Sequence, residues 1–219
     1  MLKRTVDILL ALFSLIIASP LLVVCILAIW LYDFNNPFYF AKRIGKNGKA
    51  FYIIKLRTME KDADKLGVDS TANDDDRITP IGSFIRKYKI DELAQLINVL
   101  IGNMSLVGPR PQIEKDVKLY TEKEKELLQV LPGITDFSSI VFADEGNILT
   151  GSKNPNLDYD QLIRPWKSRL GIFYVNNKTL LLDINLILLT VTSIISRKRA
   201  LNGINKILIN LSADDNLIK

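Results

Sequence analysis

Two adjacent carboxylates, Asp91 and Glu92, lie in a part of the chain where positive charge is concentrated. The basic segment from Arg86 to Lys89 precedes them, and a Gly-Pro-Arg-Pro turn that carries Arg110 follows. Arginine and lysine bind phosphate, whereas a carboxylate can act as a nucleophile or as a ligand of Mg²⁺. The residue types and their spacing therefore indicate a site that binds anions next to reactive acids.

The same two acids also have a purely structural interpretation. Apolar residues recur after them at helical spacing, namely Leu93, Leu96, Ile97 and Leu100. This periodicity predicts a helix whose first turn contains both acids, where free backbone N–H groups favour negative charge. Asp91 would then be an N-cap and Glu92 a first-turn acid without a chemical role. The residues alone leave both interpretations open.

The composition excludes several kinds of catalysis. The chain has no histidine, so an imidazole general base and a serine–histidine mechanism are ruled out. Cys25 is the only cysteine and lies in an apolar run, which excludes a disulfide framework and a thiolate metal site within one chain. Any acid, base or nucleophile must therefore be a carboxylate, a lysine, a hydroxyl or a tyrosine.

The size and charge of the chain indicate a membrane-associated domain. With 219 residues, 48% of them hydrophobic, it fits one globular domain with an apolar anchor. The net charge is +5, and basic residues gather at 42–57, 86–89 and 197–199. On composition alone such patches suit anionic lipid, nucleotide or nucleic acid. Beside an apolar anchor, membrane lipid and phosphate are favoured, and no nucleic acid partner is expected.

The anchor is the apolar segment at residues 6–32, which is long enough to cross a bilayer. Basic residues flank both of its ends, at 3–4 and at 42–49. Because positive charge marks the cytoplasmic side of a membrane, both ends are expected in the cytoplasm. A helix that is broken at Ser19 and Pro20, and so enters one leaflet and returns, meets this demand. A single span is the alternative.

Pro20 has a local consequence for any helix in this segment. It lacks a backbone N–H and so frees the carbonyl one turn earlier. The hydroxyl of Ser19 or Ser14 can satisfy a backbone group that hydrocarbon would leave unpaired.

Downstream of the anchor, the pattern predicts a small hairpin and several helices. Aromatic and β-branched residues around Asn47-Gly48 predict a hairpin at residues 38–56, with Lys55 and Arg57 at its end. Helices are predicted at 81–88, 115–131, 159–174 and 178–196, with polar loops at 60–77 and 143–155. The last helix contains Asp183 and is expected in the core or at the membrane interface rather than as a second span.

Three segments of the chain resemble the bacterial sugar transferase family of monotopic phosphoglycosyl transferases. They read KIDELAQLINVLIGNMSLVGPRP, FYFAKRIGKNGKAFYIIKLRTM and LPGIT, and the resemblance spans residues 1–195. It implies transfer of a sugar 1-phosphate from a UDP-sugar to polyprenyl (undecaprenyl) phosphate, with release of UMP. Such a reaction is the first membrane step in the assembly of an O-antigen, capsule, exopolysaccharide or glycoprotein glycan.

The resemblance also implies roles for individual residues. Asp91 would attack the sugar-bearing phosphorus and carry a covalent phospho-sugar, and Glu92 would bind Mg²⁺. Contacts with phosphate or substrate are expected of Lys55, Arg57, Arg86, Arg110 and Asp183. The surrounding cations are expected to hold the pKa of Asp91 down. Direct attack by the lipid phosphate, with Asp91 only positioning it, is the alternative mechanism, and a buried partner for an arginine is the alternative role of Asp183.

The chain departs from the family pattern in three places. Ala41 stands where the family usually has glutamine, Ala94 where it has proline, and residues 136–139 replace the usual continuation of the Pro-Gly-Ile-Thr segment. No departure removes a charged candidate residue. The contacts with sugar and nucleotide are left open.

The expected fold is α/β and mostly helical. It has a re-entrant membrane helix at 1–36, a cytoplasmic catalytic domain with a small hairpin and amphipathic interfacial helices at 37–200, and a C-terminal tail at 201–219. The expected location is the cytoplasmic face of the bacterial inner membrane. The rival hypotheses are a non-catalytic anchored module that binds anionic lipid and a single-span enzyme of another phosphotransferase class. The sugar and the oligomeric state, a homo-oligomer included, stay open.

Overall fold

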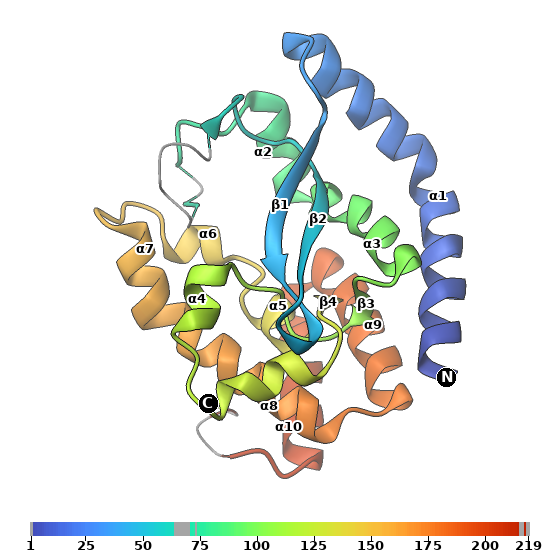
Figure 1. Cartoon of the computed structure of the whole chain (residues 1–219), viewed down its shortest axis with the longest axis vertical. Coiled ribbons are helices and arrows are strands. Elements are labelled where there is room, and N and C mark those ends of the chain that lie inside the picture. Colours follow the sequence, from blue (N-terminus) through green and yellow to red (C-terminus); the bar gives the residue numbers. More distant parts are fainter. Residues whose placement is uncertain (1, 64–70, 73, 215–216, 218–219) are drawn as a thin grey trace.

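The protein is mostly helical, with two small sheets, in a computed structural model that describes residues 2–63, 71–72, 74–214 and 217 (Figure 1). The helices are α1 (Leu2–Asp33), α2 (Pro80–Lys87), α3 (Leu96–Ile101), α4 (Glu114–Lys118), α5 (Phe137–Val141), α6 (Glu145–Ile148), α7 (Pro155–Asp158), α8 (Arg164–Asn177), α9 (Leu180–Ile195) and α10 (Arg197–Asn210). The strands are β1 (Phe38–Ile44), β2 (Ala50–Leu56), β3 (Ser105–Val107) and β4 (Gly133–Thr135). Short 3-10 or π turns are η1 (Lys46–Gly48), η3 (Ile90–Gln95), η4 (Glu124–Gln129) and η5 (Tyr159–Ile163).

Helix α1 runs along one side of the molecule and changes direction about midway (Figure 1). The predicted break at Ser19 and Pro20 is wrong, because the helix continues through Pro20. The Ser19 hydroxyl donates to the Ile16 carbonyl at 2.8 Å, which is the carbonyl that Pro20 cannot pair. The lost backbone hydrogen bond is thus replaced locally, and the helix bends instead of ending.

One face of α1 packs on the rest of the protein, and the other faces are exposed. Its buried residues are Asp7, Ala11, Leu22, Cys25 and Ile29. Large apolar side chains on the other faces are open, with Phe13 and Ile17 each 63% exposed. In the described part of the chain, α1 is the one helix that is long and apolar enough to cross a membrane.

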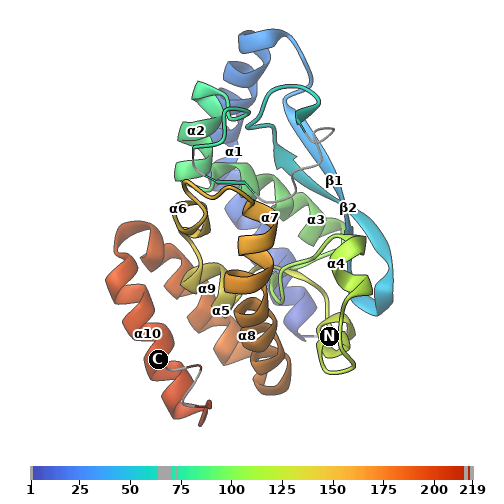
Figure 2. The same ribbon diagram turned by 90° about the vertical axis from the view of Figure 1, so that its left-hand side faces the viewer.

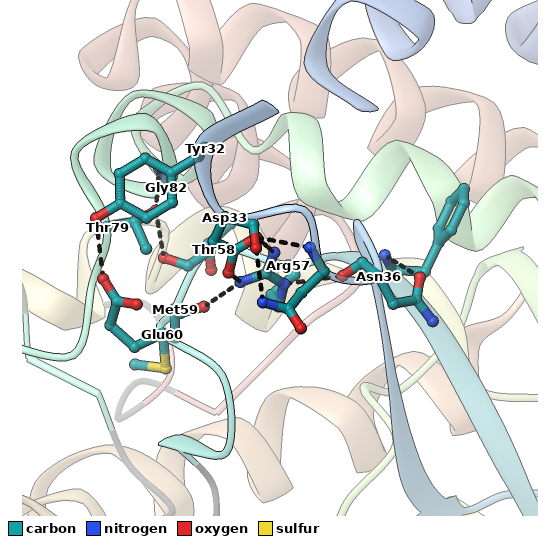
Figure 3. A network of polar contacts seen from close by, with 11 residues as sticks. Tyr32, Asp33, Asn36, Arg57, Thr58, Met59, Glu60, Thr79 and Gly82 are labelled. Atoms are coloured by element: carbon teal, nitrogen blue, oxygen red, sulfur yellow. Dashed lines mark hydrogen bonds and ion pairs between the residues drawn. The ribbon is translucent and has the colours of Figure 1, made fainter. Parts of the chain in front are cut away.

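Polar contacts hold both ends of α1 to the same domain. At its start, Lys3 Nζ donates to Asp183 at 2.5 Å, and the Arg4 guanidinium donates to the last carbonyls of α3 at 2.7 and 3.1 Å. At its end, Asp33 receives two hydrogen bonds of 2.6 and 2.7 Å from Arg57, as Figure 3 shows. The basic residues at positions 3 and 4 therefore anchor the helix to the domain. The number of basic residues on each side of the apolar segment does not predict this role.

The predicted hairpin is confirmed. Strands β1 and β2 pair antiparallel with Phe38 opposite Leu56, and the turn contains Asn47 and Gly48 at φ of 56° and 73°. These left-handed conformations are the ones that asparagine and glycine adopt most readily. The hairpin lies on one side of the molecule and α10 on the opposite side (Figure 2).

The free edge of β2 is paired by a side chain of α3. The buried Asn98 donates from Nδ2 to the Tyr52 carbonyl at 2.7 Å and accepts at Oδ1 from the Ile54 N–H at 2.9 Å. One amide side chain thus takes the place of a neighbouring strand. Because Lys55 is the next residue of β2, this contact fixes its position relative to α3.

Two glycines bring the Arg110 loop against β4. Strands β3 and β4 are parallel, and the ladder continues with Gly108 N–H to the Thr135 carbonyl and Gly133 N–H to the Pro109 carbonyl, both at 3.0 Å. A Cβ atom at Gly133 would lie 2.1 Å from the Gly108 nitrogen. Only glycine allows this approach of the two backbones, which sets where Arg110 leaves the ladder.

The C-terminal half differs from the prediction in three ways. The helix predicted at 115–131 is interrupted, because only α4 and η4 form there. The loop predicted at 143–155 contains the short helix α6. The tail predicted at 201–219 is wrong over its first part, because α10 buries Ala200, Ile204 and Leu208 at helical spacing. The helices predicted at 81–88, 159–174 and 178–196 are confirmed, with small shifts at their ends.

We predict that Gly133→Ala destabilises the protein strongly. The new methyl group would overlap backbone that cannot move aside, so the cost should be about 3 kcal/mol or more. For a domain of this size that lowers the unfolding midpoint by about 6 °C or more. Gly171→Ala is the matched control, because its closest contact is the flexible end of Leu127. Equal midpoints of the two variants, measured by thermal unfolding in detergent, would contradict this view of the ladder.

Candidate active site

The catalytic pair predicted from the sequence lies in the 3-10 turn η3, one turn before α3. Lys89 occupies the N-cap position with a left-handed backbone, φ 55°. Asp91 is therefore not the N-cap, and the structural interpretation of that residue is wrong. Its side chain is buried, and its Oδ1 atom has no hydrogen-bond partner among the described residues. An unpaired buried carboxylate oxygen is costly, and such an exception usually marks a functional site.

Glu92 is held by two cations from distant segments. Lys55 of β2 donates to Oε1 at 2.9 Å, and Arg110 reaches both oxygens, with the contact to Oε2 at 3.3 Å. Lys55 also lies 3.5 Å from Oδ2 of Asp91. The structure thus brings together two acids and two cations that lie up to 55 positions apart in the sequence.

These surroundings shift the pKa values of the two carboxyl groups in opposite directions. Burial raises the pKa of Asp91 above its ordinary value, and the charge of Lys55 offsets this only in part. Burial also acts on Glu92, but Arg110 and Lys55 outweigh it and hold the pKa of Glu92 well below its usual range. The expectation that cations hold the pKa of Asp91 down is therefore wrong. Glu92 is the fixed anion, and Asp91 is the more basic of the two carboxylates.

Arg86 completes this cluster from α2. The Thr79 hydroxyl caps that helix by accepting from Gly82 N–H, and a Cβ at Gly82 would overlap the Thr58 carbonyl at 1.9 Å. The tight contact places Arg86 with Nη1 3.4 Å from the Thr58 hydroxyl. From there its charge opposes the rise in the pKa of Asp91.

Two residues predicted for the site lie elsewhere. Arg57 is paired with Asp33 at the end of α1 and does not join the cluster (Figure 3). Asp183 is buried, accepts from the Tyr174 hydroxyl at 2.6 Å and pairs with Lys3, so its cation is a lysine and not an arginine. Both residues tie α1 to the domain.

Sequence reasoning missed a second acid and its cation beside Arg110. Glu145 of α6 forms an ion pair with Lys167 of α8, whose ammonium lies 5.1 Å from the centre of the Tyr159 ring. Burial alone would raise the pKa of Glu145, but Lys167 and Arg110 hold it below its usual value. The sequence around Glu145 and Lys167 does not indicate that they pair, because residues 143–155 have the composition of an ordinary polar loop.

The cluster suits Mg²⁺ only together with a substrate. The described residues contain no group of three or more acids, cysteines or histidines that could hold a metal ion by themselves. Among the described residues, Asp91 Oδ1 has no hydrogen-bond partner, and Glu92 Oε2 makes only the long contact with Arg110. Mg²⁺ is commonly bound by one or two carboxylates plus substrate phosphate, and these oxygens fit that ligand set.

Comparison with known proteins identifies the family of this chain. The sequence profile described as bacterial sugar transferase matches residues 1–197. The chain belongs to the bacterial sugar transferase family. This membership makes it an enzyme, a phosphoglycosyl transferase, and it excludes the non-catalytic lipid-binding module.

Relatives of this chain include bacterial proteins of similar and of greater length. EpsL, a sugar transferase of Bacillus subtilis, is 36% identical over 195 residues, 89% of this chain and 87% of that protein. The exopolysaccharide production protein PSS of Rhizobium leguminosarum is 36% identical over 208 residues, 90% of this chain and 96% of that protein. The undecaprenyl-phosphate galactose phosphotransferase of Salmonella typhimurium is 33% identical over 217 residues, which cover 91% of this chain but 41% of the longer protein.

We predict opposite stability effects for the two carboxylates of this bacterial sugar transferase. Asp91→Asn should raise the unfolding midpoint at neutral pH by about 2 °C, because the protein no longer buries that charge. Since the pKa of Asp91 is raised in the folded state, the gain should shrink as the pH falls through that pKa. Glu92→Gln should cost about 2 kcal/mol, because Arg110 loses its partner in a partly buried pair.

Thermal unfolding in detergent at several pH values checks both variants. A lower midpoint for Asp91→Asn at neutral pH would mean that the Asp91 charge stabilises the fold, contrary to the burial that the structure shows.

Proposed function

We propose that the enzyme transfers a sugar 1-phosphate from a UDP-sugar to undecaprenyl phosphate or a related polyprenyl phosphate and releases UMP. The observation that carries this proposal is the buried Asp91, with an unpaired oxygen among Lys55, Arg86 and Arg110. A relative is named as an undecaprenyl-phosphate galactose phosphotransferase, which supports the acceptor. Names of others refer to exopolysaccharide production, in keeping with the first membrane step of a glycan pathway.

The reaction we propose consists of two displacements at one phosphorus atom. An Asp91 oxygen forms a bond to the sugar-bearing phosphorus, and the anhydride bond breaks with its electron pair on UMP. An oxygen of the lipid phosphate then attacks the same phosphorus and releases the Asp91 carboxylate. The product is a polyprenyl diphosphate sugar. No proton transfer is required, in keeping with a chain that has no histidine.

The charges around Asp91 suit this chemistry. The attacking carboxylate and the diphosphate are both anions, so their approach needs positive charge at the site of reaction. Lys55 and Arg86 both act electrostatically on Asp91, and Arg110 is fixed beside it through Glu92. The raised pKa of Asp91 makes its ionised form a more basic nucleophile than an ordinary aspartate.

Glu92 is the residue that we propose as the Mg²⁺ ligand, and the neighbouring Asp91 carboxylate is a second candidate ligand. The ion would supply further positive charge to the phosphate groups. The ion pairs with Lys55 and Arg110 keep Glu92 ionised, and only the ionised carboxylate binds a metal well.

The surface of the molecule supports an enzyme that acts on a membrane-bound acceptor. Both ends of α1 contact one domain, whereas a helix that spans the bilayer would carry one end to the far side. We therefore propose that α1 is re-entrant, bent at Pro20, with the domain on the cytoplasmic face of the inner membrane. A second apolar face lies on α9, with outward residues Leu181, Ile184, Leu188, Val191 and Ile195. Such a face suits the bilayer interface.

The proposed mechanism predicts one UMP per active site when UDP-sugar and Mg²⁺ are added without lipid phosphate. The protein mass should rise by one phospho-sugar, located on Asp91 by peptide mass spectrometry, because the first displacement needs no acceptor. Asp91→Asn should release no UMP and gain no mass. Glu92→Gln, and the wild type in EDTA, should be slower by a factor of about 100 or more.

If UMP appears only when both substrates are present, and no adduct forms, the lipid phosphate attacks directly and Asp91 only positions it. Full activity in EDTA would remove Glu92 from the role of metal ligand.

The re-entrant helix predicts that its two ends lie on the same side of the membrane. In a Cys25→Ser background, single cysteines at Leu2 and Lys46 should both be shielded from an impermeant thiol reagent in intact cells. Both should react once the inner membrane is permeabilised. A cysteine at Phe13, on the exposed apolar face, serves as the lipid-shielded control. Labelling of one end but not the other in intact cells would establish a spanning helix instead.

A further inference from the structure

An acid inside the apolar helix α1 contacts the strand that leads to Arg110. Asp7 lies among apolar residues near the start of this helix and is only 4% exposed. Its Oδ2 atom accepts from the Ser105 hydroxyl at 2.8 Å, and its Oδ1 atom accepts from the Leu106 N–H at 3.2 Å. Both partners belong to β3, which lies beside the first turns of α1 (Figure 1). Because a buried carboxyl group in an apolar helix is costly, its presence indicates a function.

Lys3, one helical turn before Asp7, contacts the next residue of the same strand. Its ammonium donates to the Val107 carbonyl at 3.3 Å and also pairs with Asp183. The Tyr174 hydroxyl lies 3.1 Å from this carbonyl, but it has a single proton and a nearer acceptor in Asp183, at 2.6 Å. The ammonium of Lys3 has three protons and can serve both acceptors. One face of α1 therefore contacts two consecutive residues of β3, in the place of a neighbouring strand.

The other edge of this strand, and the loop that follows it, are held by β4. Ser105, Gly108 and Pro109 make backbone hydrogen bonds of 2.9 to 3.0 Å with β4 and the residue before it. The residues between them, 106 and 107, are the two that α1 contacts. Arg110 follows directly. The whole segment in front of Arg110 is therefore held between the sheet on one side and α1 on the other.

We propose that Asp7 is a positioning residue for the transfer reaction and acts through β3 on Arg110. The inference rests on the proposed function, in which Arg110 supplies positive charge beside the reacting carboxylates. Arg110 donates to both oxygens of Glu92, so its place is set by where the strand ends. Without Asp7, the N–H of the buried Leu106 loses its acceptor, and the segment in front of Arg110 shifts.

Steady-state release of UMP by the full-length protein in detergent tests this role, with undecaprenyl phosphate and the UDP-sugar of a panel that the wild type accepts best. Asp7→Ala should lower kcat/KM about tenfold, because small displacements of a catalytic cation are costly. Asp7→Asn should lower it less than about threefold. Its amide oxygen still accepts from Leu106, and its amide N–H can donate to the Ser105 oxygen, whose proton then turns to the Val107 carbonyl 3.0 Å away.

A double-mutant cycle with Arg110→Gln separates positioning from a purely structural role. In the Arg110→Gln background, Asp7→Ala should change kcat/KM by less than about twofold, because no guanidinium is left to misplace. The effect of Asp7→Ala on the unfolding midpoint should also be smaller in that background, because the ion pair with Glu92 is already lost. Ile204→Val is the control for stability, since Ile204 is buried on α10, which packs on α5 and α9. It should lower the midpoint and leave kcat/KM unchanged.

Ser105→Ala removes one of the two donors to Asp7 and carries the same cycles, with smaller effects, if the alanine variant at Asp7 does not fold. Full activity of Asp7→Ala, or an equal loss of kcat/KM with and without Arg110, would overturn the inference and leave the proposed function standing. If the wild type releases UMP from no UDP-sugar, the proposed function fails, and the midpoint cycle alone decides. Additive midpoint effects of Asp7→Ala and Arg110→Gln then overturn the positioning role, and coupled effects support it.

Discussion

The ion pairs of Glu92 with Lys55 and Arg110 are the contacts on which the site depends. Two adjacent carboxylates can be buried together only if positive charge compensates them, and no cation on their own turn does so through a direct contact in the described structure. Lys55 must come from the hairpin and Arg110 from the loop after β3. The fold positions both cations, because Asn98 fixes the edge of β2 and two glycines fix the start of the loop.

The two cations compensate the charges of Glu92 and Asp91 unequally, and the two acids therefore differ in pKa. Glu92 takes the hydrogen bonds of both cations and becomes a strong, fixed anion. Asp91 keeps an oxygen that has no hydrogen-bond partner in the described part of the chain, and its pKa is raised. A buried carboxyl group in that state weakens the fold, a cost that is common at active sites. The same neighbourhood therefore gives two adjacent carboxylates pKa values that are shifted in opposite directions.

Helix α1 is held by residues that lie close in the chain to those of the site or on a helix of the same domain. Asp33 at the end of α1 holds Arg57, which lies two positions after Lys55 in the chain. At the other end of α1, Lys3 pairs with Asp183 of α9, the second helix with an exposed apolar face. The apolar surfaces and the charged cluster are thus parts of one rigid arrangement.

Much of the local structure was predictable from the sequence, because it depends on residues close together in the chain. The Asn47-Gly48 hairpin, the start of α2 at Thr79 and Pro80, and the long apolar helix all follow from backbone preference and periodicity. The family segments indicated the activity and the importance of Asp91 and Glu92. Tertiary structure alone decided which charges meet: it paired Arg57 and Asp183 with α1 and placed Glu145 and Lys167 beside Arg110. It also decided the direction of the pKa of Asp91, because burial depends on residues that are far away in the sequence.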